Sequence, residues 1–316
     1  MPVKHLLGAC MKFRTHSLSC LFSAALLLMS DMAHAAGSFT AESLAANLYL
    51  IKGPSGNTLV AADTDGLILV EGVPAELADE YLAFVKTTAG NDTIKALVNT
   101  HWHPESAGLN ATLRVQGVDV ISHANTKQWL GSTIRRRGDE ILHTPLPAEQ
   151  LPNKIFYDTL SLPFRGGSIE LGYLVQAHTD GDIYAWFPAQ RVLYTGPAVR
   201  TDSWSAVDEA TNGFVGSLMD GYDKLAPLVA ADVRVIPASG APLDKAGFDA
   251  QMAMYKNLMA EMVKLLRQSR SAEEVVIANP AVGLMPEWDD PSAFLDEGFR
   301  SFYGHLRDNQ HIGAMP

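Results

Sequence analysis

The chain has very little cysteine, since Cys10 and Cys20 are the only two among 316 residues. Both lie in an N-terminal segment that we expect to be removed. The mature protein would then have no disulfide, no thiolate metal ligand and no cysteine nucleophile. Basic residues are also scarce, because 24 Lys and Arg face 35 Asp and Glu and give a formal charge of −11. This charge argues against nucleic acid and anionic membrane surfaces as partners, since both require a basic face.

The N-terminal segment has no hydrophobic run long enough to span a bilayer, but it has the features of a secretory signal. Lys12 and Arg14 follow Met11, a natural initiator, and a short apolar stretch at 18–29 precedes Ala33-His34-Ala35. Cleavage after residue 35 would remove three basic residues and one acidic residue, which moves the charge from −11 to −13. We expect an exported protein, periplasmic or secreted from a bacterium, with no membrane insertion after cleavage.

The remaining chain reads as two β-rich halves, each followed by helical segments. Runs at 47–52, 58–62 and 67–70 are separated by Gly- and Asp-rich turns, which is typical of an antiparallel meander. A helix at 74–86 and an apolar strand at 94–98 come next. The second half has its β-rich runs at 154–162, 168–177, 183–187, 191–195 and 233–236, with a helix at 214–229. This order predicts an α+β protein, an αββα sandwich of two facing sheets with helices outside.

We expect a signal peptide at 1–35, one sandwich domain at 36–243 and a helical extension at 244–316 that packs on the same domain. Within the extension, helices are predicted to Gln268 and at about 291–306. The connection at 131–153 lacks periodicity and contains Arg135-Arg136-Arg137. It is either a functional lid that receives an anionic substrate or a solvated surface segment.

Two histidines follow the end of the apolar strand at 94–98. His101 and His103, at i and i+2 where the backbone turns, can direct both imidazoles at one point, as metal-binding loops do. Residues 100–110 resemble the Thr-His-x-His-x-Asp-His-x-Gly-x-Asn signature of the metallo-β-lactamase superfamily. Glu105 stands where that family has Asp, and Ser106 where it has His.

Three further stretches carry the same resemblance. Residues 177–182 are similar to the family's His-Thr-x-Gly-Asp element, and 193–196 to the strand before its Thr-Gly-Asp, where this chain has Pro197. Residues 235–240 are similar to Val-Ile-Pro-Gly-His-Gly, with Ser239 in place of the His. The likeness runs from about Asn47 to Gly240 and implies the αββα sandwich as well.

The resemblance implies that one of the family's two metal sites is retained. Its three ligands are His101, His103 and His178. The second site and the bridging position are occupied instead by Glu105, Ser106, Pro197 and Ser239. Proline cannot ligate through its side chain and serine is a poor zinc ligand, so we expect one zinc ion per chain.

A three-histidine zinc site with an open fourth position implies a hydrolase that activates water. Glu105 would act as general base or anchor for that water, and Asp182 would orient a ligand histidine through its other ring nitrogen. The expected substrate is a small molecule with a reactive carbonyl: a lactone, ester, thioester or amide.

Several alternatives stay open at this point. One alternative is that the histidines hold a structural or adventitious metal, or no metal, and another is that Glu105 turns outward into solvent. A further alternative is that the chain is an inactive module that binds a small molecule or a protein partner. Redox chemistry on iron ranks last, because Pro197 replaces the bridging Asp that it usually needs. For His123, which closes the strand at 118–122, we favour a structural role.

Overall fold

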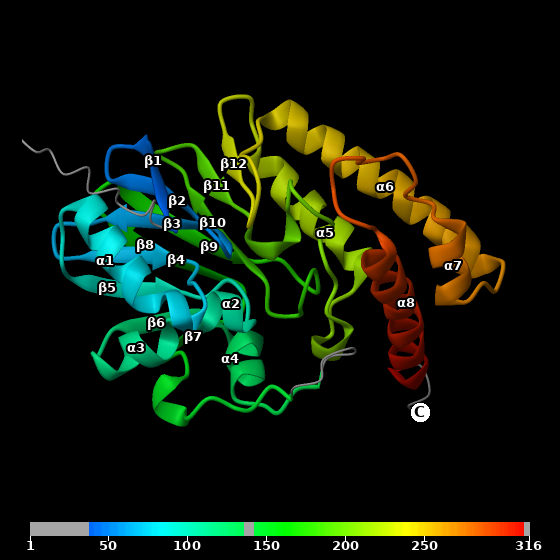
Figure 1. The fold of residues 1–316 in the computed structure, drawn as a ribbon, viewed down its shortest axis with the longest axis horizontal. Helices are drawn as coiled ribbons and strands as arrows, with labels where there is room; N and C mark the ends of the chain where they lie inside the picture. The colour runs from blue at the N-terminus through cyan, green and yellow to red at the C-terminus, as the bar shows by residue number, and fades with distance from the viewer. Residues whose placement is uncertain (1–37, 136–141, 313–316) are drawn as a thin grey trace, which may run out of the picture. The chain divides into compact units, whose positions relative to one another are not determined.

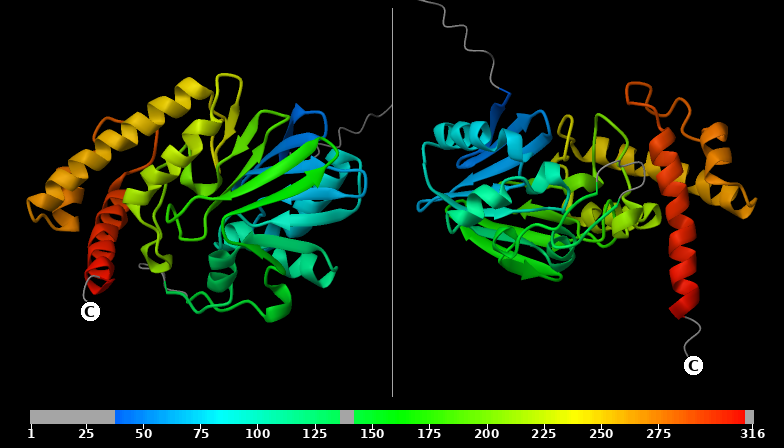
Figure 2. Two further views of the ribbon diagram at one scale, coloured as in Figure 1. Left: turned by 180° about the vertical axis from the view of Figure 1, so that it is seen from behind. Right: turned by 60° about the horizontal axis from the view of Figure 1, so that its bottom comes forward.

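The computed structural model describes residues 38–135 and 142–312, which form two β-sheets packed face to face with helices on both outer sides (Figure 1; Figure 2). The predicted signal segment at 1–35 lies outside the described residues. The αββα sandwich and the additional C-terminal helices that the sequence predicts are confirmed.

The first sheet has seven strands in sequential order, antiparallel from β1 to β4 and parallel from β4 to β7. The strands are β1 (Thr40–Ala45), β2 (Leu48–Gly53), β3 (Gly56–Ala62), β4 (Leu67–Val70), β5 (Ile94–Val98), β6 (Asp119–His123) and β7 (Lys154–Phe156). Parallel neighbours require crossover connections. Helices in these connections are α1 (Ala78–Ala89), α2 (Pro104–Ala107), α3 (Asn110–Val115) and α4 (Ala124–Leu130).

The strand β1 is absent from the sequence-based prediction. Its sequence, TAESLA, has one β-branched residue and no aromatic residue, so its propensity for a strand is low. The segment lies at the edge of the sheet, where β2 supplies an antiparallel partner from Thr40 to Ala45. Tertiary pairing therefore overrides local propensity here.

The second sheet has the order β12-β11-β10-β9-β8, and only its β11–β12 pair is parallel. Its strands are β8 (Thr159–Phe164), β9 (Gly167–Tyr173), β10 (Ile183–Phe187), β11 (Val192–Tyr194) and β12 (Arg234–Ile236). The helix α5 (Val215–Leu225) lies between β11 and β12 in the sequence, as a parallel crossover requires. Short 3₁₀ turns are η1 (Ala75–Leu77), η2 (Ala148–Gln150), η3 (Gly196–Ala198), η4 (Glu209–Thr211) and η5 (Ala226–Leu228).

Alternation along the strands separates the inner core from the outer ones. In β3, Leu59 and Ala61 belong to the cluster between the two sheets, whereas Val60 packs against the outer layer with Tyr81 and Val85 of α1. Successive side chains of a strand point to opposite faces, so both faces of β3 are apolar and both are covered. The second sheet contributes Leu171, Ala185 and other residues to the same inner core.

The C-terminal helices complete the outer layer of the second sheet. They are α6 (Lys245–Arg267), α7 (Ala272–Ala278) and α8 (Ser292–Ile312), of which α7 is absent from the sequence-based prediction. Tyr255 and Phe299 lie in one apolar cluster with Tyr222 of α5. The predicted domain boundary at 243 falls just before α6. Across residues 38–135 and 142–312, no helix is both long and apolar enough to cross a membrane.

Candidate metal centre

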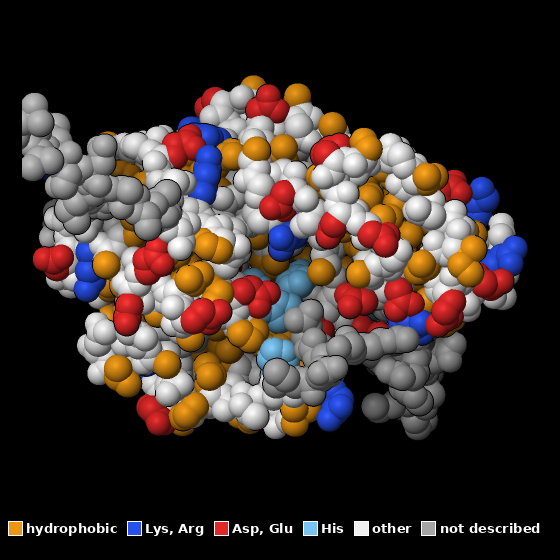
Figure 3. All heavy atoms as spheres, in the orientation of Figure 1, with side chains coloured by type: hydrophobic (Ala, Val, Ile, Leu, Met, Phe, Trp, Pro, Cys, Tyr) orange, Lys and Arg blue, Asp and Glu red, His pale blue; other side chains and the backbone are white. Residues whose placement is uncertain are grey.

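The three predicted ligands lie at one edge of the sandwich, where strands of both sheets end. His101 and His103 follow β5, and His178 lies in the connection between β9 and β10. The two sheets are linked here by a backbone hydrogen bond of 3.0 Å from the Ile183 N–H to the Thr100 carbonyl. Figure 3 shows histidine side chains near the centre of this face, with acidic side chains around them.

The histidines form a compact cluster suited to one metal ion. Ring nitrogens of His101, His103 and His178 lie within 4.8 Å of one another, and all three residues are buried. The Nε2 atom of His178 is 2.9 Å from Nδ1 of His103. Among the described residues, these three histidines are the group of three or more His, Cys, Asp or Glu side chains that lie close enough together to hold one metal ion.

Two of the rings are already oriented by groups on their far sides. His103 Nε2 is 2.8 Å from Oδ2 of buried Asp208, and His178 Nδ1 is 2.8 Å from the Ala206 carbonyl oxygen. Each of these nitrogens can donate a proton to its oxygen, which leaves His103 Nδ1 and His178 Nε2 facing the shared centre as acceptors. A ligand histidine held in this way has its tautomer and ring plane fixed.

The donor set fits a zinc ion. Three neutral imidazoles with an open fourth position form a recognised catalytic zinc arrangement. Burial lowers the pKa of His178 well below its ordinary value, and repulsion from His103 and His101 lowers it further. The neutral imidazole that results is the form that binds metal.

Asp182 is fully buried beside His178, but its contacts differ from the predicted ones. Its Oδ2 accepts the backbone N–H groups of His178 at 2.6 Å and of Thr179 at 3.0 Å, and its Oδ1 accepts the Thr179 hydroxyl at 2.6 Å. Burial raises the pKa of Asp182 to about 7. The carboxylate therefore fixes the backbone that carries His178, while the Ala206 carbonyl contacts the ring nitrogen.

Glu105 lies at the rim of the centre. Its Oε1 is 3.6 Å from His103 Nδ1, and its side chain is 51% exposed, so the carboxylate borders the site and also meets solvent. It is within reach of a small molecule held at the histidines. This position is compatible with the base or anchoring role that the sequence analysis assigns to it.

The positions that the resemblance assigns to a second metal carry neither His nor Asp. Ser106 Oγ is 3.2 Å from Nδ1 of His101, Pro197 lines the cavity, and Ser239 Oγ donates to Asp202 at 2.5 Å. The cavity at the histidines has a volume of about 120 Å³. Its other lining residues include Ser55, Asn57, Tyr194 and Arg200.

Two residues at the centre were missed by the sequence analysis. Glu71 directly follows β4, is buried, and accepts a hydrogen bond from the Thr100 hydroxyl, with its Oε2 3.7 Å from Nδ1 of His101. Burial lowers the pKa of His101, but the neighbouring carboxyl groups of Glu71, Glu105 and Asp182 together outweigh it, so the net shift is upward. A charged residue directly after a fully apolar strand was the available signal for Glu71. Nothing local marks Asp208, which is 105 residues from His103 in the sequence.

The favoured structural role of His123 is confirmed. Its Nδ1 accepts the Asn125 N–H at the start of α4, its Nε2 is 3.0 Å from the Tyr157 carbonyl, and its ring stacks on Tyr173 at 4.0 Å. Of the arginine run, Arg135 is exposed and lines none of the pockets described here, and residues 136 and 137 lie outside the described residues.

Comparisons with known proteins agree with this architecture. Residues 51–240 match the sequence profile of the Metallo-beta-lactamase superfamily. A Metallo-beta-lactamase type 2 from Bacteroides fragilis is 23% identical over 185 residues, which is 56% of this chain and 69% of that protein. A metallo-beta-lactamase from Pontibacter korlensis superposes with a TM-score of 0.58 at 17% identity, over 69% of this chain and 99% of its own.

A second kind of structure is also similar. The stereoselective inverting sec-alkylsulfatase Pisa1 from Pseudomonas sp. superposes with a TM-score of 0.64 at 15% identity, and the match covers 84% of this chain. The chain spans 50% of the length of that protein. At these identities the structures establish the fold, while the profile match extends over more than half of the sequence. The chain therefore belongs to the metallo-β-lactamase superfamily.

Proposed function

We propose that this chain is a zinc-dependent hydrolase with one metal ion, acting on a small molecule with a reactive carbonyl (a lactone, ester, thioester or amide). The observation that carries the proposal is the buried cluster of His101, His103 and His178, whose ring nitrogens lie within 4.8 Å of one another. Outer partners orient two of the rings before any metal binds. Ligand side chains that are held in place by such outer hydrogen-bond partners are typical of a metal centre.

A single ion is supported by the chemistry of the neighbouring positions. Ser106 and Ser239 offer hydroxyl groups, and Pro197 offers no side-chain ligand atom, at positions where the family has imidazole and carboxylate groups. Hydroxyl groups are weak zinc ligands beside histidine. The Ser239 hydroxyl is moreover engaged with Asp202.

When bound, zinc would lower the pKa of water in its open position to about 7 and act as a Lewis acid toward the carbonyl oxygen. Glu105 takes the proton that the attacking water loses as its oxygen bonds to the carbonyl carbon. The bond from that carbon to the leaving oxygen, sulfur or nitrogen then breaks, and Glu105 returns the proton to the leaving atom. Asp208 and the Ala206 carbonyl keep two histidines in their ligating tautomers.

The proposal includes export. The sequence features at 11–35 support a cleaved signal peptide, which would deliver a cysteine-free mature protein to the periplasm or the medium. Amino-terminal sequencing of the protein recovered from the periplasm tests this. A chain that retains residues before Ala36 would contradict it.

The decisive experiment combines metal analysis with turnover. Mature protein purified without chelator is compared with the His101→Ala/His178→Ala double variant, and both are offered lactones, esters, thioesters, amides and β-lactams. About one zinc per chain, with turnover that the double variant lacks, is the expected result. Stoichiometric zinc without turnover would favour the inactive binding module, and no zinc after loading would overturn both the metal site and the hydrolase.

A further inference from the structure

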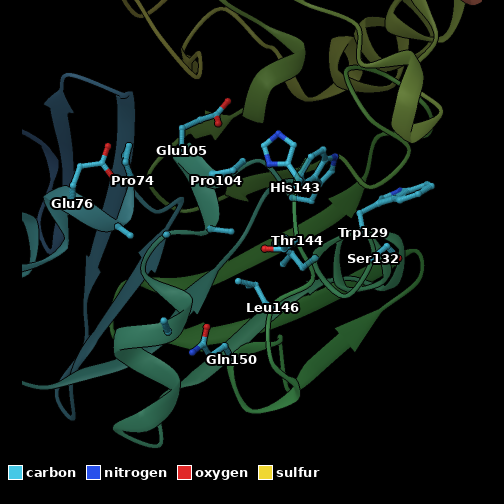
Figure 4. A pocket seen from close by; sticks show the side chains of 16 residues that line it. Pro74, Glu76, Pro104, Glu105, Trp129, Ser132, His143, Thr144, Leu146 and Gln150 are labelled. Atoms are coloured by element: carbon cyan, nitrogen blue, oxygen red, sulfur yellow. The ribbon is translucent and has the colours of Figure 1, made fainter. Parts of the chain in front are cut away.

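A second pocket of about 560 Å³ lies beside the histidine cavity. Its walls come from residues 74–76 at the start of η1, α2, α3, the end of α4 and the segment at 143–150, and most of its side chains are apolar (Figure 4). Apolar members include Trp102, Leu130 and Leu146. A pocket of this volume and character is of the kind that holds a small organic ligand.

The short helix α2 separates this pocket from the metal centre. Ser106 lines the histidine cavity, Ala107 lines the apolar pocket, and Glu105 lines both. In Figure 4, Glu105 and Pro104 lie toward the same side of the pocket as His143. A molecule that reaches past Glu105 can therefore contact the histidines with one end and the apolar walls with the other.

The pocket wall is also coupled to a metal ligand through Trp102. Its ring centroid is 4.5 Å from that of His103 and 5.2 Å from that of His143, which lines the pocket. The Trp102 indole N–H donates to Thr211 Oγ1 at 3.0 Å, and that hydroxyl donates to Asp208 at 2.9 Å. The alternation His-Trp-His thus directs two imidazoles to the metal side and the indole toward the pocket.

The charged residues that line the pocket limit the charge of the ligand that it can bind. Among the described residues that line the pocket, Glu76 and Glu105 are acidic and none is Lys or Arg. A carboxylate or phosphate placed there would meet the like charge of both glutamates, with no Lys or Arg among these residues to pair with. The occupant should be uncharged and apolar.

We propose that this pocket binds an uncharged aliphatic chain of the substrate whose carbonyl reacts at the histidines. The inference rests on the proposed function and specifies its substrate class: esters, lactones or related carbonyl compounds with a medium-length alkyl chain. Each methylene buried contributes about 0.8 kcal/mol, which is roughly a fourfold gain in kcat/KM.

Two homologous series test this chain-length dependence on the zinc-loaded protein: methyl esters of straight-chain acids, and straight-chain alkyl acetates. In at least one series, kcat/KM should rise about fourfold per methylene and then level off when the pocket is full. Turnover without chain-length dependence in either series would overturn the pocket assignment and leave the hydrolase intact.

A binding measurement separates the pocket from catalysis. Calorimetric titration with 1-octanol should show binding to the wild type and equally to the His101→Ala/His178→Ala variant. In the His101→Ala/His178→Ala variant, which lacks two of the zinc ligands, octanoate should bind more weakly than 1-octanol because of Glu76 and Glu105. Octanol binding in a protein that hydrolyses nothing would support the pocket while removing the proposed reaction.

Filling the pocket provides the structural control. Ala111, which lines it from α3, is changed to Trp, and Ala250, exposed on α6, is changed to Trp as the matched variant. The Ala111→Trp protein should lose tenfold or more in octanol affinity, and Ala250→Trp should not. If Ala111→Trp fails to fold, Leu146→Trp replaces it, and unchanged octanol binding in a folded pocket variant would overturn the assignment.

Discussion

Asp208 should determine how tightly the chain holds zinc, although it does not touch the metal. Replacing Asp208 by Asn keeps an oxygen that can accept the Ala210 N–H, which Oδ1 now accepts at 3.1 Å. It removes the charged oxygen that lies 2.8 Å from Nε2 of His103. The same oxygen accepts the Thr211 hydroxyl at 2.9 Å, so the side chain keeps its size while His103 and Thr211 both lose this acceptor.

The expected magnitude for zinc binding follows from the contact with His103. Loss of an outer partner of a ligand histidine typically costs 10- to 100-fold in metal affinity, or about 1.4–2.7 kcal/mol. With the carboxylate gone, His103 no longer has an anionic acceptor that favours a proton on Nε2. The tautomer that leaves Nδ1 free to ligate becomes less populated.

Competition with a chromophoric zinc chelator measures the affinity directly. Asp220→Asn, which removes an exposed carboxylate from α5, controls for the change in net charge. Asp208→Asn should bind zinc at least tenfold more weakly than this control, and circular dichroism should show both folded. Equal affinity in the two variants would refute the role assigned to Asp208 and the ligation through Nδ1.

Three further predictions follow from the structure. Glu105→Gln should lower kcat by about 10²- to 10⁴-fold at unchanged zinc content, and turnover unaffected by the change would exclude Glu105 as the base. Leu50→Ala, in the core between the sheets, should lower the free energy of unfolding by about 2–5 kcal/mol in urea titrations, and a loss well below 1 kcal/mol would contradict that packing. Burial lowers the pKa of His123 below 6.5, although the Tyr157 carbonyl and Asp180 partly oppose it. The folded state therefore binds fewer protons than the unfolded state, and the free energy of unfolding should fall as the pH drops below 6.5. This fall should be less steep in the His123→Gln variant. An NMR titration of the His123 ring with a midpoint above 6.5 would contradict the assignment.

Much of the architecture was determined locally. Apolar alternation and turn residues predicted most strands, because a strand with one or two buried faces leaves a period-two pattern in the sequence. The histidine trio was predictable in two ways: His101 and His103 follow the end of an apolar strand, and His178 was assigned from the resemblance of residues 177–182 to the family's His-Thr-x-Gly-Asp element. Strand ends in a layered fold meet at one edge, so short motifs there identify side chains that converge.

Other features exist only in the folded chain. The strand β1 forms because β2 offers an edge, and the apolar pocket forms because α2, α3, α4 and the segment at 143–150 come together. Asp208 reaches His103 across 105 residues of sequence, and Asp182 proved to hold the backbone of His178 while a carbonyl holds its ring. A motif specifies which side chains can bind a metal. Which oxygens orient those side chains, and what space lies beside them, depends on contacts between distant segments that leave no local pattern in the sequence.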